Sequence, residues 1–457
     1  MCIRDRVITI DGTSAGGGTD GIVLGIGSDS SEVRGLFIIN FNSDGIDILS
    51  SNNWIYGNYL GVEQDGVTTA GNRDDGIQIE DGANGNRIGT DGDGATDNFE
   101  RNIIGDNKEG ISVLGDSVNS ANIISGNYIG LGADGVTEAG NSNAGVLLFN
   151  GPDGVTIGGA SSDLGNVISG NQGSGIVLTG ESTNSNTIQN NLIGTSADAS
   201  QNIGNADRGI EVVLSSDDNQ ILDNIIAGSG SVGVVVSDDS SGNILHGNII
   251  GSDATGEFDW GSAEAGILLE GGANNNTIGG VGAGEGNTIA FSGQSGNSAH
   301  AGIIVEDGAV ANSIRGNNIY ANDGVAVDLG ATVGADGSDP NDVGDLDSGG
   351  NNKQNWAVLT SAGIADDGTL NYELDTTTLT TGTYTVDFYA STDRNNGEVE
   401  LERYLGSVTG IADGNSSFTG TLSGITVEAG EYITLITTDA IGNSLSLIHI
   451  SEPTRPY

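Results

Sequence analysis

Short runs of alternating apolar and polar residues, separated by Gly, Asn or Asp, repeat through most of the chain. The first recurring phrase is Gly followed by apolar residues at every second position. It occurs as Gly45-Ile46-Asp47-Ile48, Gly76-Ile77-Gln78-Ile79, Gly110-Ile111-Ser112-Val113, Gly145-Val146, Gly175-Ile176, Gly209-Ile210-Glu211-Val212, Gly233-Val234, Gly266-Ile267, Gly302-Ile303 and Gly324-Val325. Because successive side chains of a strand point to opposite faces, each phrase predicts a short strand with one buried face.

Two further phrases follow the first in a fixed order. One is Asn-x-Ile, as in Asn86-Arg87-Ile88 and Asn186-Thr187-Ile188, and the other is Gly-Asn-x-Ile-Gly, as in Gly126-Asn127-Tyr128-Ile129-Gly130. Three short strands and three turns make one coil, which cannot bury its apolar stripe alone. Coils stacked about 4.8 Å apart give continuous interior columns of Ile, Val and Leu. We therefore predict a right-handed parallel β-helix over residues 7–332, with about 11 coils counted from Gly21-Ile22.

Polar residues recur at the corners of the predicted coils. Asn at equivalent corners can stack as ladders of amide groups or adopt left-handed turn geometry. Longer coils carry insertions after the third strand, such as the segment from Gly130 to Asn141. Surface loops tolerate such changes in length and can carry recognition.

The amino-acid composition and the spacing of apolar residues change after the repeat. Residues 333–355 form an acidic linker, which includes Asp336-Gly337-Ser338-Asp339-Pro340. Residues 356–444 are rich in Thr, Tyr and Val with longer alternating runs, which predict a small antiparallel β-sandwich of immunoglobulin-like type. The expected fold class is therefore all-β throughout.

Both ends of the chain stand apart from the repeat. Residues 1–6 (Met1-Cys2-Ile3-Arg4-Asp5-Arg6) and residues 445–457 resemble translated sequencing-adapter read-through, and we exclude them from the fold prediction. We accordingly expect the remaining stretch to be part of a larger multidomain protein.

The charge limits the partners. The formal net charge is -49 at pH 7. Nucleic acid is excluded as a partner, because phosphate binding requires clustered Lys and Arg. The sequence contains no apolar run long enough to predict a membrane span. Such acidity suits a soluble exterior or calcium chelation.

The coils with Gly-Asn-x-Ile-Gly, the Asp-rich link with Asn351-Asn352-Lys353-Gln354-Asn355-Trp356 and the following sandwich resemble bacterial right-handed β-helix repeat proteins of the cell surface. The resemblance covers nearly the whole chain. It implies a secreted or cell-surface location in bacteria. Members of that family are often adhesin-like and mostly have no assigned reaction. The resemblance says little about function. We predict a non-catalytic, adhesin-like scaffold that binds a polysaccharide, extracellular matrix or another cell-surface ligand, because the core pattern is well kept and no matching catalytic set accompanies it.

Two Asp clusters are candidate metal sites. Calcium binds several oxygen ligands and tolerates irregular geometry. Asp342, Asp345 and Asp347 lie beside flexible Gly residues in the linker, and Asp91, Asp93 and Asp97 form a second cluster. Neither matches the full twelve-residue calcium-loop pattern. Calcium is the expected cofactor, with solvated turns as the alternative reading.

The competing hypothesis is a carbohydrate-active enzyme, either a polysaccharide lyase or a glycoside hydrolase, that uses an acidic ladder on the outer face of the β-helix. In the Gly-Ile strand, residues two and four after each Gly point outward, and neither outward row contains Lys or Arg, which a polysaccharide lyase acting on uronates would need. Glu270, Glu306 and Asp328 occupy equivalent predicted positions in successive coils. Such a ladder could bind calcium or supply the carboxylate pair of a glycoside hydrolase.

The outward positions from Leu147 to Ile304 are mostly apolar. An exposed row of this kind is unusual in a monomer. We expect insertion loops, the sandwich or a partner to cover it.

Overall fold

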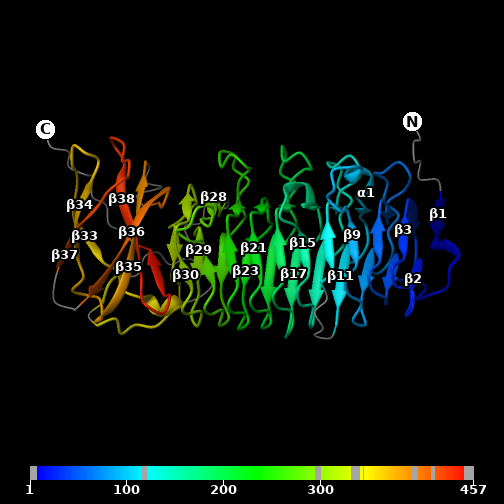
Figure 1. The fold of residues 1–457 in the computed structure, drawn as a ribbon, viewed down its shortest axis with the longest axis horizontal. Helices are drawn as coiled ribbons and strands as arrows, with labels where there is room; N and C mark the ends of the chain where they lie inside the picture. Colours follow the sequence, from blue (N-terminus) through cyan, green and yellow to red (C-terminus); the bar gives the residue numbers. More distant parts are fainter. Residues whose placement is uncertain are drawn as a thin grey trace. The chain divides into compact units, whose positions relative to one another are not determined.

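A computed structural model describes residues 8–115, 121–293, 300–330, 340–342, 344–392, 400–412 and 417–446. The excluded segment 1–6 and residues 447–457 lie outside the described residues. The three sequence phrases form three parallel sheets, in which each strand lies between the equivalent strands of the preceding and following coils. The predicted parallel β-helix is therefore confirmed (Figure 1).

Sheet A contains the Gly-Asn-x-Ile-Gly phrases. Its strands are β1 (Ile8–Asp11), β4 (Leu36–Ile39), β7 (Tyr59–Leu60), β10 (Ile103–Ile104), β13 (Tyr128–Ile129), β16 (Val167–Ile168), β19 (Leu192–Ile193), β22 (Ile225–Ile226), β25 (Ile249–Ile250), β28 (Thr288–Ala290) and β31 (Asn318–Tyr320).

Sheet B contains the Gly-Ile phrases. Its strands are β2 (Ile22–Leu24), β5 (Ile46–Ile48), β8 (Ile77–Ile79), β11 (Ile111–Leu114), β14 (Val146–Phe149), β17 (Ile176–Thr179), β20 (Ile210–Val213), β23 (Val232–Val236), β26 (Ala265–Leu269), β29 (Ile303–Val305) and β32 (Val327–Asp328).

Sheet C contains the Asn-x-Ile phrases. Its strands are β3 (Glu32–Arg34), β6 (Trp54–Tyr56), β9 (Arg87–Gly89), β12 (Ile123–Ser125), β15 (Thr156–Gly158), β18 (Thr187–Gln189), β21 (Gln220–Leu222), β24 (Ile244–His246), β27 (Thr277–Ile278) and β30 (Ser313–Ile314). The short helices are η1 (Gly12–Ser14), α1 (Asp97–Glu100), η2 (Ser162–Leu164) and η3 (Gly350–Lys353).

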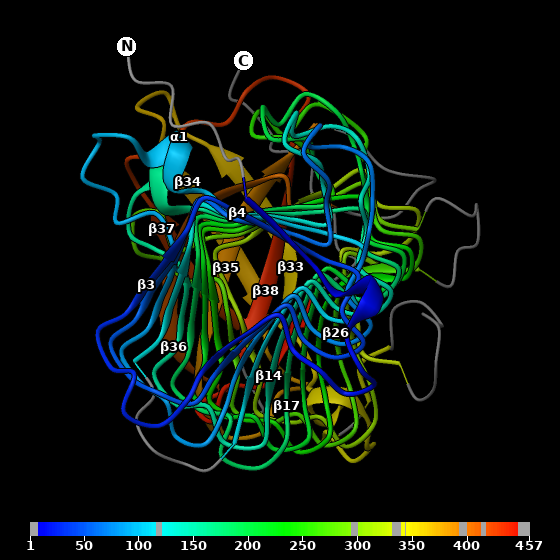
Figure 2. The same cartoon turned by 90° about the vertical axis from the view of Figure 1, so that its right-hand side faces the viewer.

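The chain divides into two compact units. The first comprises Met1–Val235 and Asp253–Trp260, and the second comprises Val236–Ser252 and Gly261–Tyr457. In the first unit, strands β3, β4 and β14 mark three faces around a common interior (Figure 2). Ile46, Ile77 and Ile111 lie in register on neighbouring strands of sheet B, and each is fully buried in that interior.

Buried Asn side chains form ladders along the corners, as predicted. In one ladder the Asn127 amide donates to Asn166 Oδ1 at 3.0 Å and to the Ile88 carbonyl at 2.9 Å. Asn127 Oδ1 in turn accepts from the backbone and side-chain nitrogens of Asn102, at 3.2 and 2.9 Å. Other Asn residues take the left-handed alternative, for example Asn190 with φ 57°. Both expected roles of Asn thus occur in the same fold.

The C-terminal part contains two antiparallel sheets. One consists of β33 (Val358–Ile364), β34 (Leu370–Asp375) and β37 (Ser417–Leu422), and the other of β36 (Arg403–Ala412), β35 (Gly382–Ser391), β38 (Tyr432–Thr438) and β39 (Ser444–Ser446). Side chains of both sheets share one core, which includes Leu359, Tyr372, Phe388 and Leu435. An antiparallel sandwich is therefore observed, and it extends to Ser446. Its immunoglobulin-like character stays a prediction.

In the second unit, the last coil contacts both the acidic linker and the sandwich. Asn351 of η3 accepts from the Asn312 backbone at 2.9 Å and so continues the Asn ladder. Ile319 pairs with Leu401 in an antiparallel bridge. The Arg315 guanidinium binds both carboxylate oxygens of Asp387 on β35, at 2.7 and 2.8 Å. The contacts of Asn312 and Ile319 satisfy backbone groups that an open sheet edge would leave free.

Candidate functional site

A groove of about 530 Å³ lies on the outer face of sheet A in the first unit. Its floor and walls come from different coils. The lining residues are Thr90, Gly94, Thr96, Asp97, Asn98, Phe99, Arg101, Gly126, Tyr128, Ser162, Asp163, Gly165, Val167, Asn190, Leu192 and Ala197. The volume is in the range of a small-molecule or cofactor site.

Strand geometry places the floor of the groove. In Gly-Asn-x-Ile-Gly the Ile points into the core, so the preceding residue points outward. Ile129 is accordingly fully buried, while Tyr128 before it is half-buried and faces the groove. Val167 and Leu192 occupy the same register position in the next two coils. The floor is thus an aromatic and aliphatic strip.

One wall includes Ala197, which belongs to the hairpin closed by the bridge between Thr195 and Asn202. The insertion from Gly130 to Asn141, predicted as a recognition loop, forms the equivalent hairpin two coils earlier. Leu131 and Glu138 pair in an antiparallel bridge, so the segment between them is a small hairpin. Asp134 closes its turn by accepting from the Thr137 backbone at 2.9 Å and hydroxyl at 2.6 Å. These hydrogen bonds hold the pKa of Asp134 below its usual range despite partial burial. The equivalent hairpins stack, since the Ala197 nitrogen donates to the Gly135 carbonyl at 3.0 Å.

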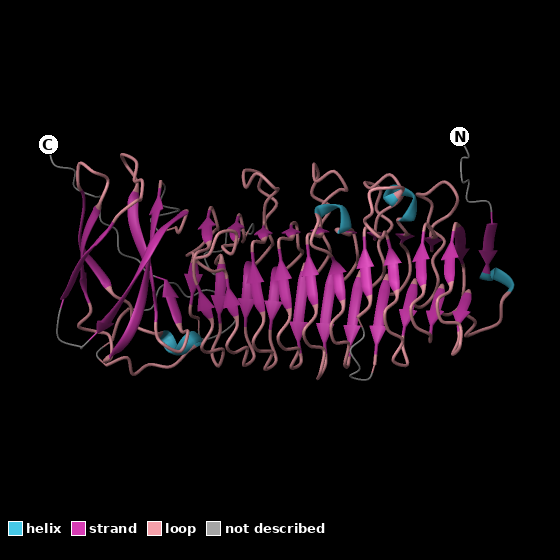
Figure 3. Ribbon diagram, in the orientation of Figure 1, coloured by secondary structure: helices cyan, strands magenta, loops and turns pink. Residues whose placement is uncertain are grey.

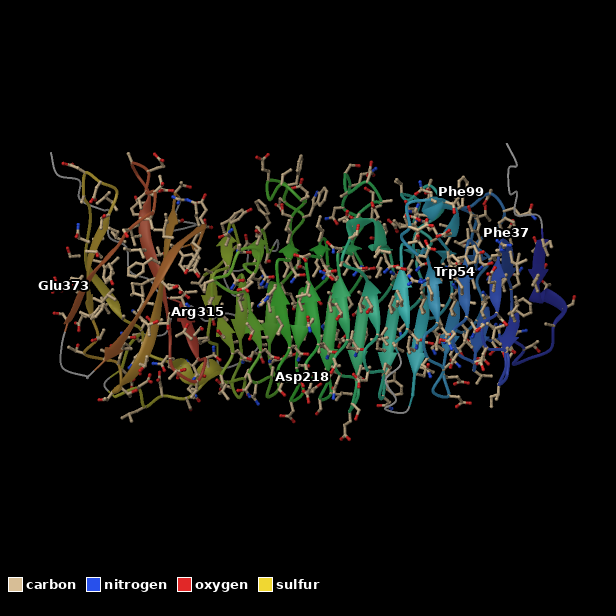
Figure 4. The ribbon with its side chains drawn as sticks, viewed as in Figure 1. Phe37, Trp54, Phe99, Asp218, Arg315 and Glu373 are labelled. Atoms are coloured by element: carbon tan, nitrogen blue, oxygen red, sulfur yellow. The ribbon has the colours of Figure 1, made fainter. Side chains whose placement is uncertain are left out.

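The opposite wall contains α1 and η2, which stand among the loops on one side of the coils (Figure 3). Glu100 is buried at the end of α1 and anchors it, because its carboxylate accepts from the Thr96 and Thr90 hydroxyls at 2.9 and 3.2 Å. Phe99 instead projects outward and is 71% exposed (Figure 4). An exposed Phe at the rim of a polar groove is typical of a binding surface rather than of a core.

Arg101 joins the α1 wall to the floor. Its guanidinium carbon lies 4.0 Å from the centre of the Tyr128 ring, and its Nε donates to the Gly126 carbonyl at 2.9 Å. Burial lowers the pKa of Arg101. The cation–π contact fixes the orientation of the Tyr128 ring.

The predicted cluster Asp91, Asp93 and Asp97 comes together beside this groove. Each residue offers one carboxylate oxygen, and the three oxygens lie within 4.8 Å of one another. Asp97 also lines the groove, and its Oδ1 is buried without a hydrogen-bond partner among the described residues. The arrangement suits an oxygen-seeking cation such as calcium.

The linker cluster Asp342, Asp345 and Asp347 also comes together within 4.8 Å. Asp345 accepts from the Asn355 backbone at 2.7 Å. Burial is the main cause that raises the pKa of Asp345, and the charges of Asp342 and Asp347 add to it. This cluster lies in the second unit, and the described groove does not include it.

The predicted ladder of Glu270, Glu306 and Asp328 is wrong in one member. Ile304 pairs with Asp328, so Asp328 lies two residues out of step with Glu306. The Gly324-Val325 phrase caused the error: Ala326 occupies the Gly position of this coil, as its carbonyl approaches Gly302. Glu270 and Glu306 remain neighbours, because Leu269 pairs with Val305. Burial, followed by the charge of Glu270, raises the pKa of Glu306.

A second carboxylate ladder, which was not predicted from the sequence, occurs earlier on sheet B. Its members precede the Gly of successive Gly-Ile phrases and are Asp20, Asp44, Asp75 and Glu109. The register follows from the pairing of Ile22 with Ile46, Ile46 with Ile77, and Ile77 with Ile111. The recurring Asp or Glu immediately before Gly could have predicted this ladder. The sequence prediction considered only the outward positions after Gly. We call these four residues, with Asp47 and Asp74, the acidic ladder.

Burial perturbs the acidic ladder strongly. It raises the pKa of Asp75 to about 8, of Asp44 to about 7 and of Asp47 to about 6. In each case desolvation of the charged form is the largest cause, and neighbouring carboxylates add to it. Asp75 accepts a short hydrogen bond from the Ser112 hydroxyl, which partly offsets the shift.

These shifts predict a pH-dependent stability. A carboxyl with a raised pKa keeps its proton in the folded state at pH values where the unfolded chain, with a pKa of about 3.9, has lost it. The free energy of unfolding therefore falls as pH rises from about 4 toward 8. In buffer with a chelator, Asp75→Asn should raise the Tm by an amount that grows over this window and then levels off. A thermal melt at pH 8 would measure this rise, because each kcal/mol of added stability shifts the Tm by about 2–4 °C.

The exposed Glu63 supplies the control for this experiment. Glu63→Gln removes one negative charge without touching the buried cluster. It should leave the melting temperature nearly unchanged at every pH. If Asp75→Asn and Glu63→Gln gave parallel curves, the burial argument would fail.

The apolar outward row of sheet B exists as predicted. Val235 and Ile304 are buried, and Leu147, Val177 and Leu268 are half-buried.

The groove residues Phe99, Arg101 and Tyr128 were not predicted from the sequence. Tyr128 carried a readable signal, because it is an aromatic residue at an outward strand position. Phe99 and Arg101 belong to a loop whose path no periodicity describes.

Comparison with known protein families finds none that matches the chain. Comparison with characterised proteins finds no significant sequence relative. Within the described parts of the chain, no helix combines the length and hydropathy needed to cross a bilayer.

Several solved structures are similar at low identity. The periplasmic alginate epimerase AlgG has 14% identity and a TM-score of 0.37, over 64% of this chain and 57% of the epimerase chain. The enzymatically active domain of bacteriophage CBA120 tailspike protein 2 has 11% identity and a TM-score of 0.40, over 96% and 75%. PfbA, a surface adhesin of Streptococcus pneumoniae, has 12% identity and a TM-score of 0.22, over 74% and 81%. The likeness is one of fold, and none of these activities transfers to this chain by it.

Proposed function

We propose that the chain is a secreted or cell-surface scaffold of a bacterium that binds glycans in the groove on sheet A without chemically altering them. The observation that carries the proposal is the pairing of Tyr128 in the floor with the exposed Phe99 at the rim, in a groove whose walls also carry polar side chains. Aromatic faces supply contact area to the apolar side of a sugar ring. Polar side chains such as Asn98 and Asn190 can hydrogen-bond its hydroxyls.

The charge of the chain narrows the ligand. A net charge of -49 repels polyanions, and Asp97 and Asp163 place further carboxylates in the groove. Arg101 is already engaged with Tyr128 and Gly126. We therefore infer a neutral polysaccharide, or a neutral stretch of an extracellular-matrix or cell-surface glycan, as the ligand.

Calcium has a specific place in this proposal. Asp97 belongs both to the Asp91–Asp93–Asp97 cluster and to the groove wall, so an ion held there would fix α1 and the Phe99 rim. The linker cluster around Asp345 is a second proposed calcium site. Chelation should therefore weaken glycan binding through α1.

A binding experiment tests the proposal. Neutral polysaccharides immobilised on an array would identify a ligand, and isothermal titration calorimetry with an oligosaccharide of it would give the Kd. Phe99→Ala and Tyr128→Ala should each weaken binding about 10-fold, since truncation of a central aromatic contact commonly exceeds 1 kcal/mol. Phe258→Ala is the matched control, because Phe258 is 58% exposed in the same unit but outside the groove.

Two results would contradict the proposal. One is unchanged affinity in both groove variants. The other is measured cleavage of a polysaccharide by the purified protein, which would favour the second candidate, a glycoside hydrolase. The observation for that candidate is the neighbouring pair Glu270 and Glu306 with a raised pKa on Glu306, as a general acid requires. Loss of the cleavage in Glu306→Gln would then assign the activity to that pair.

A further inference from the structure

The acidic ladder concentrates negative charge where water has little access. Asp44, Asp75 and Glu109 are 5%, 4% and 3% exposed, and Asp47 is 8% exposed. Ladder positions in neighbouring coils are separated by about one strand spacing, 4.8 Å. Burial of several ionised carboxylates so close together is unfavourable unless a cation or protons neutralise them.

Some of these oxygens have no partner. Within the described ranges, Asp75 Oδ1 and Asp47 Oδ1 are buried and lack a hydrogen-bond partner. Glu109 Oε2 is likewise buried without a hydrogen-bond partner, whereas Asp44 Oδ1 accepts from the Asp75 backbone at 2.8 Å and Asp75 Oδ2 accepts from Ser112. Buried carboxylate oxygens without a partner are rare in folded proteins and indicate a missing ion or water.

The chain supplies little positive charge of its own at this place. Lys108 binds Asp74 Oδ1 at 2.9 Å and lies 3.3 Å from Glu109 Oε2. Its side chain is 53% exposed, so it neutralises the outer edge of the cluster. Asp44, Asp75 and Asp47 have no ion pair among those the structure describes.

The geometry points to a divalent cation, Ca²⁺, held by Asp44, Asp74 and Asp75 of the acidic ladder, with Asp47 and Glu109 beside it. Asp44, Asp74 and Asp75 each offer a carboxylate oxygen, and these oxygens lie within 4.8 Å of one another. Hard oxygen ligands without sulfur or imidazole favour calcium or magnesium, and an irregular cluster favours calcium. The depth of the cluster excludes a sugar as the ligand, because a glycosidic bond cannot reach carboxylates this buried.

The proposed Ca²⁺ site in the acidic ladder has a structural role, unlike the groove. Asp44 and Asp75 belong to successive coils, and Glu109 belongs to the third. An ion at this place would tie coils together in the way a covalent staple does. Its expected effect is on stability, whereas glycan affinity should not depend on it.

Calorimetry on the full chain tests the inference against the two loop clusters. The starting variant carries Asp93→Asn, Asp97→Asn, Asp342→Asn and Asp345→Asn, which disable the other candidate sites. This variant should still bind one Ca²⁺ and gain thermal stability from it. Adding Asp75→Asn, or in a separate variant Asp44→Asn, should weaken Ca²⁺ binding at least 10-fold and abolish the thermal gain. Adding Glu63→Gln instead should change neither.

A second variant gives an effect of opposite sign. Lys108→Met removes the ammonium that competes for Asp74 and Glu109, so Ca²⁺ should bind several-fold more tightly. Hydrogen exchange would locate the ion, with Ca²⁺-dependent protection expected in residues 41–50 and 71–80. The inference is overturned if the starting variant binds no Ca²⁺, if Asp75→Asn and Asp44→Asn both retain binding, or if protection appears elsewhere. Glycan binding by the groove would survive any of these results.

Discussion

Replacing Arg315 by Met is expected to lower the free energy of unfolding of the second unit by about 3–5 kcal/mol. Arg315 forms a two-pronged ion pair with Asp387, whose side chain is fully buried. Methionine fills part of the same volume but leaves the carboxylate without its counter-charge. An unpaired buried charge is far more unfavourable than the absence of the pair. Denaturant unfolding followed by tryptophan fluorescence would measure the loss.

A compensating variant separates charge from packing. Arg315→Met combined with Asp387→Leu removes both charges and should recover most of the lost stability. If the double variant were as unstable as Arg315→Met alone, the loss would come from packing and not from the buried charge.

Replacing Asn127 by Leu is expected to destabilise the first unit by about 2–5 kcal/mol, from about 1–3 kcal/mol for each buried polar group left without a partner. The change removes both hydrogen bonds that Asn127 Oδ1 accepts from Asn102 and the bond that its amide donates to the Ile88 carbonyl. All of these groups are buried, so water cannot replace the lost partners. Thermal unfolding monitored by circular dichroism would report the change.

Asn98 offers the comparison for this ladder. Asn98 is exposed on α1, and Asn98→Leu should change stability by less than about 0.5 kcal/mol. Equal effects of Asn98→Leu and Asn127→Leu would show that the ladder hydrogen bonds contribute no more to stability than an exposed Asn does.

The fold could be predicted because its local and long-range signals agree. Every coil repeats the same apolar spacing, so the burial of Ile46 predicts that of Ile77 and Ile111. The predicted position of Asp328 was wrong because its coil breaks the pattern. Ala326 replaces the usual Gly, and counting from Gly324 shifted Asp328 by two residues.

The candidate sites were harder to predict, for a physical reason. Asp91, Asp93 and Asp97 are close in sequence, so their proximity in space was foreseeable. The groove depends instead on loops that cross from one coil to another, such as α1 and η2, and these paths have no period. The burial of Asp75 depends on the residues that pack over it. The alternation of apolar and polar residues along the strand does not predict those contacts.

The stacked hairpins form a modular surface beside the groove, which they reach through Ala197. Each hairpin, such as those closed by Asp65, Asp134 and Asp198, belongs to one coil and is tied to its neighbour by backbone hydrogen bonds. The core of the coil does not depend on the side chains at the hairpin tips. Exchanging residues 195–202, whose Ala197 lines the groove, for those of another coil would therefore change a single contact zone, about 4.8 Å wide, while the zones on either side keep their specificity.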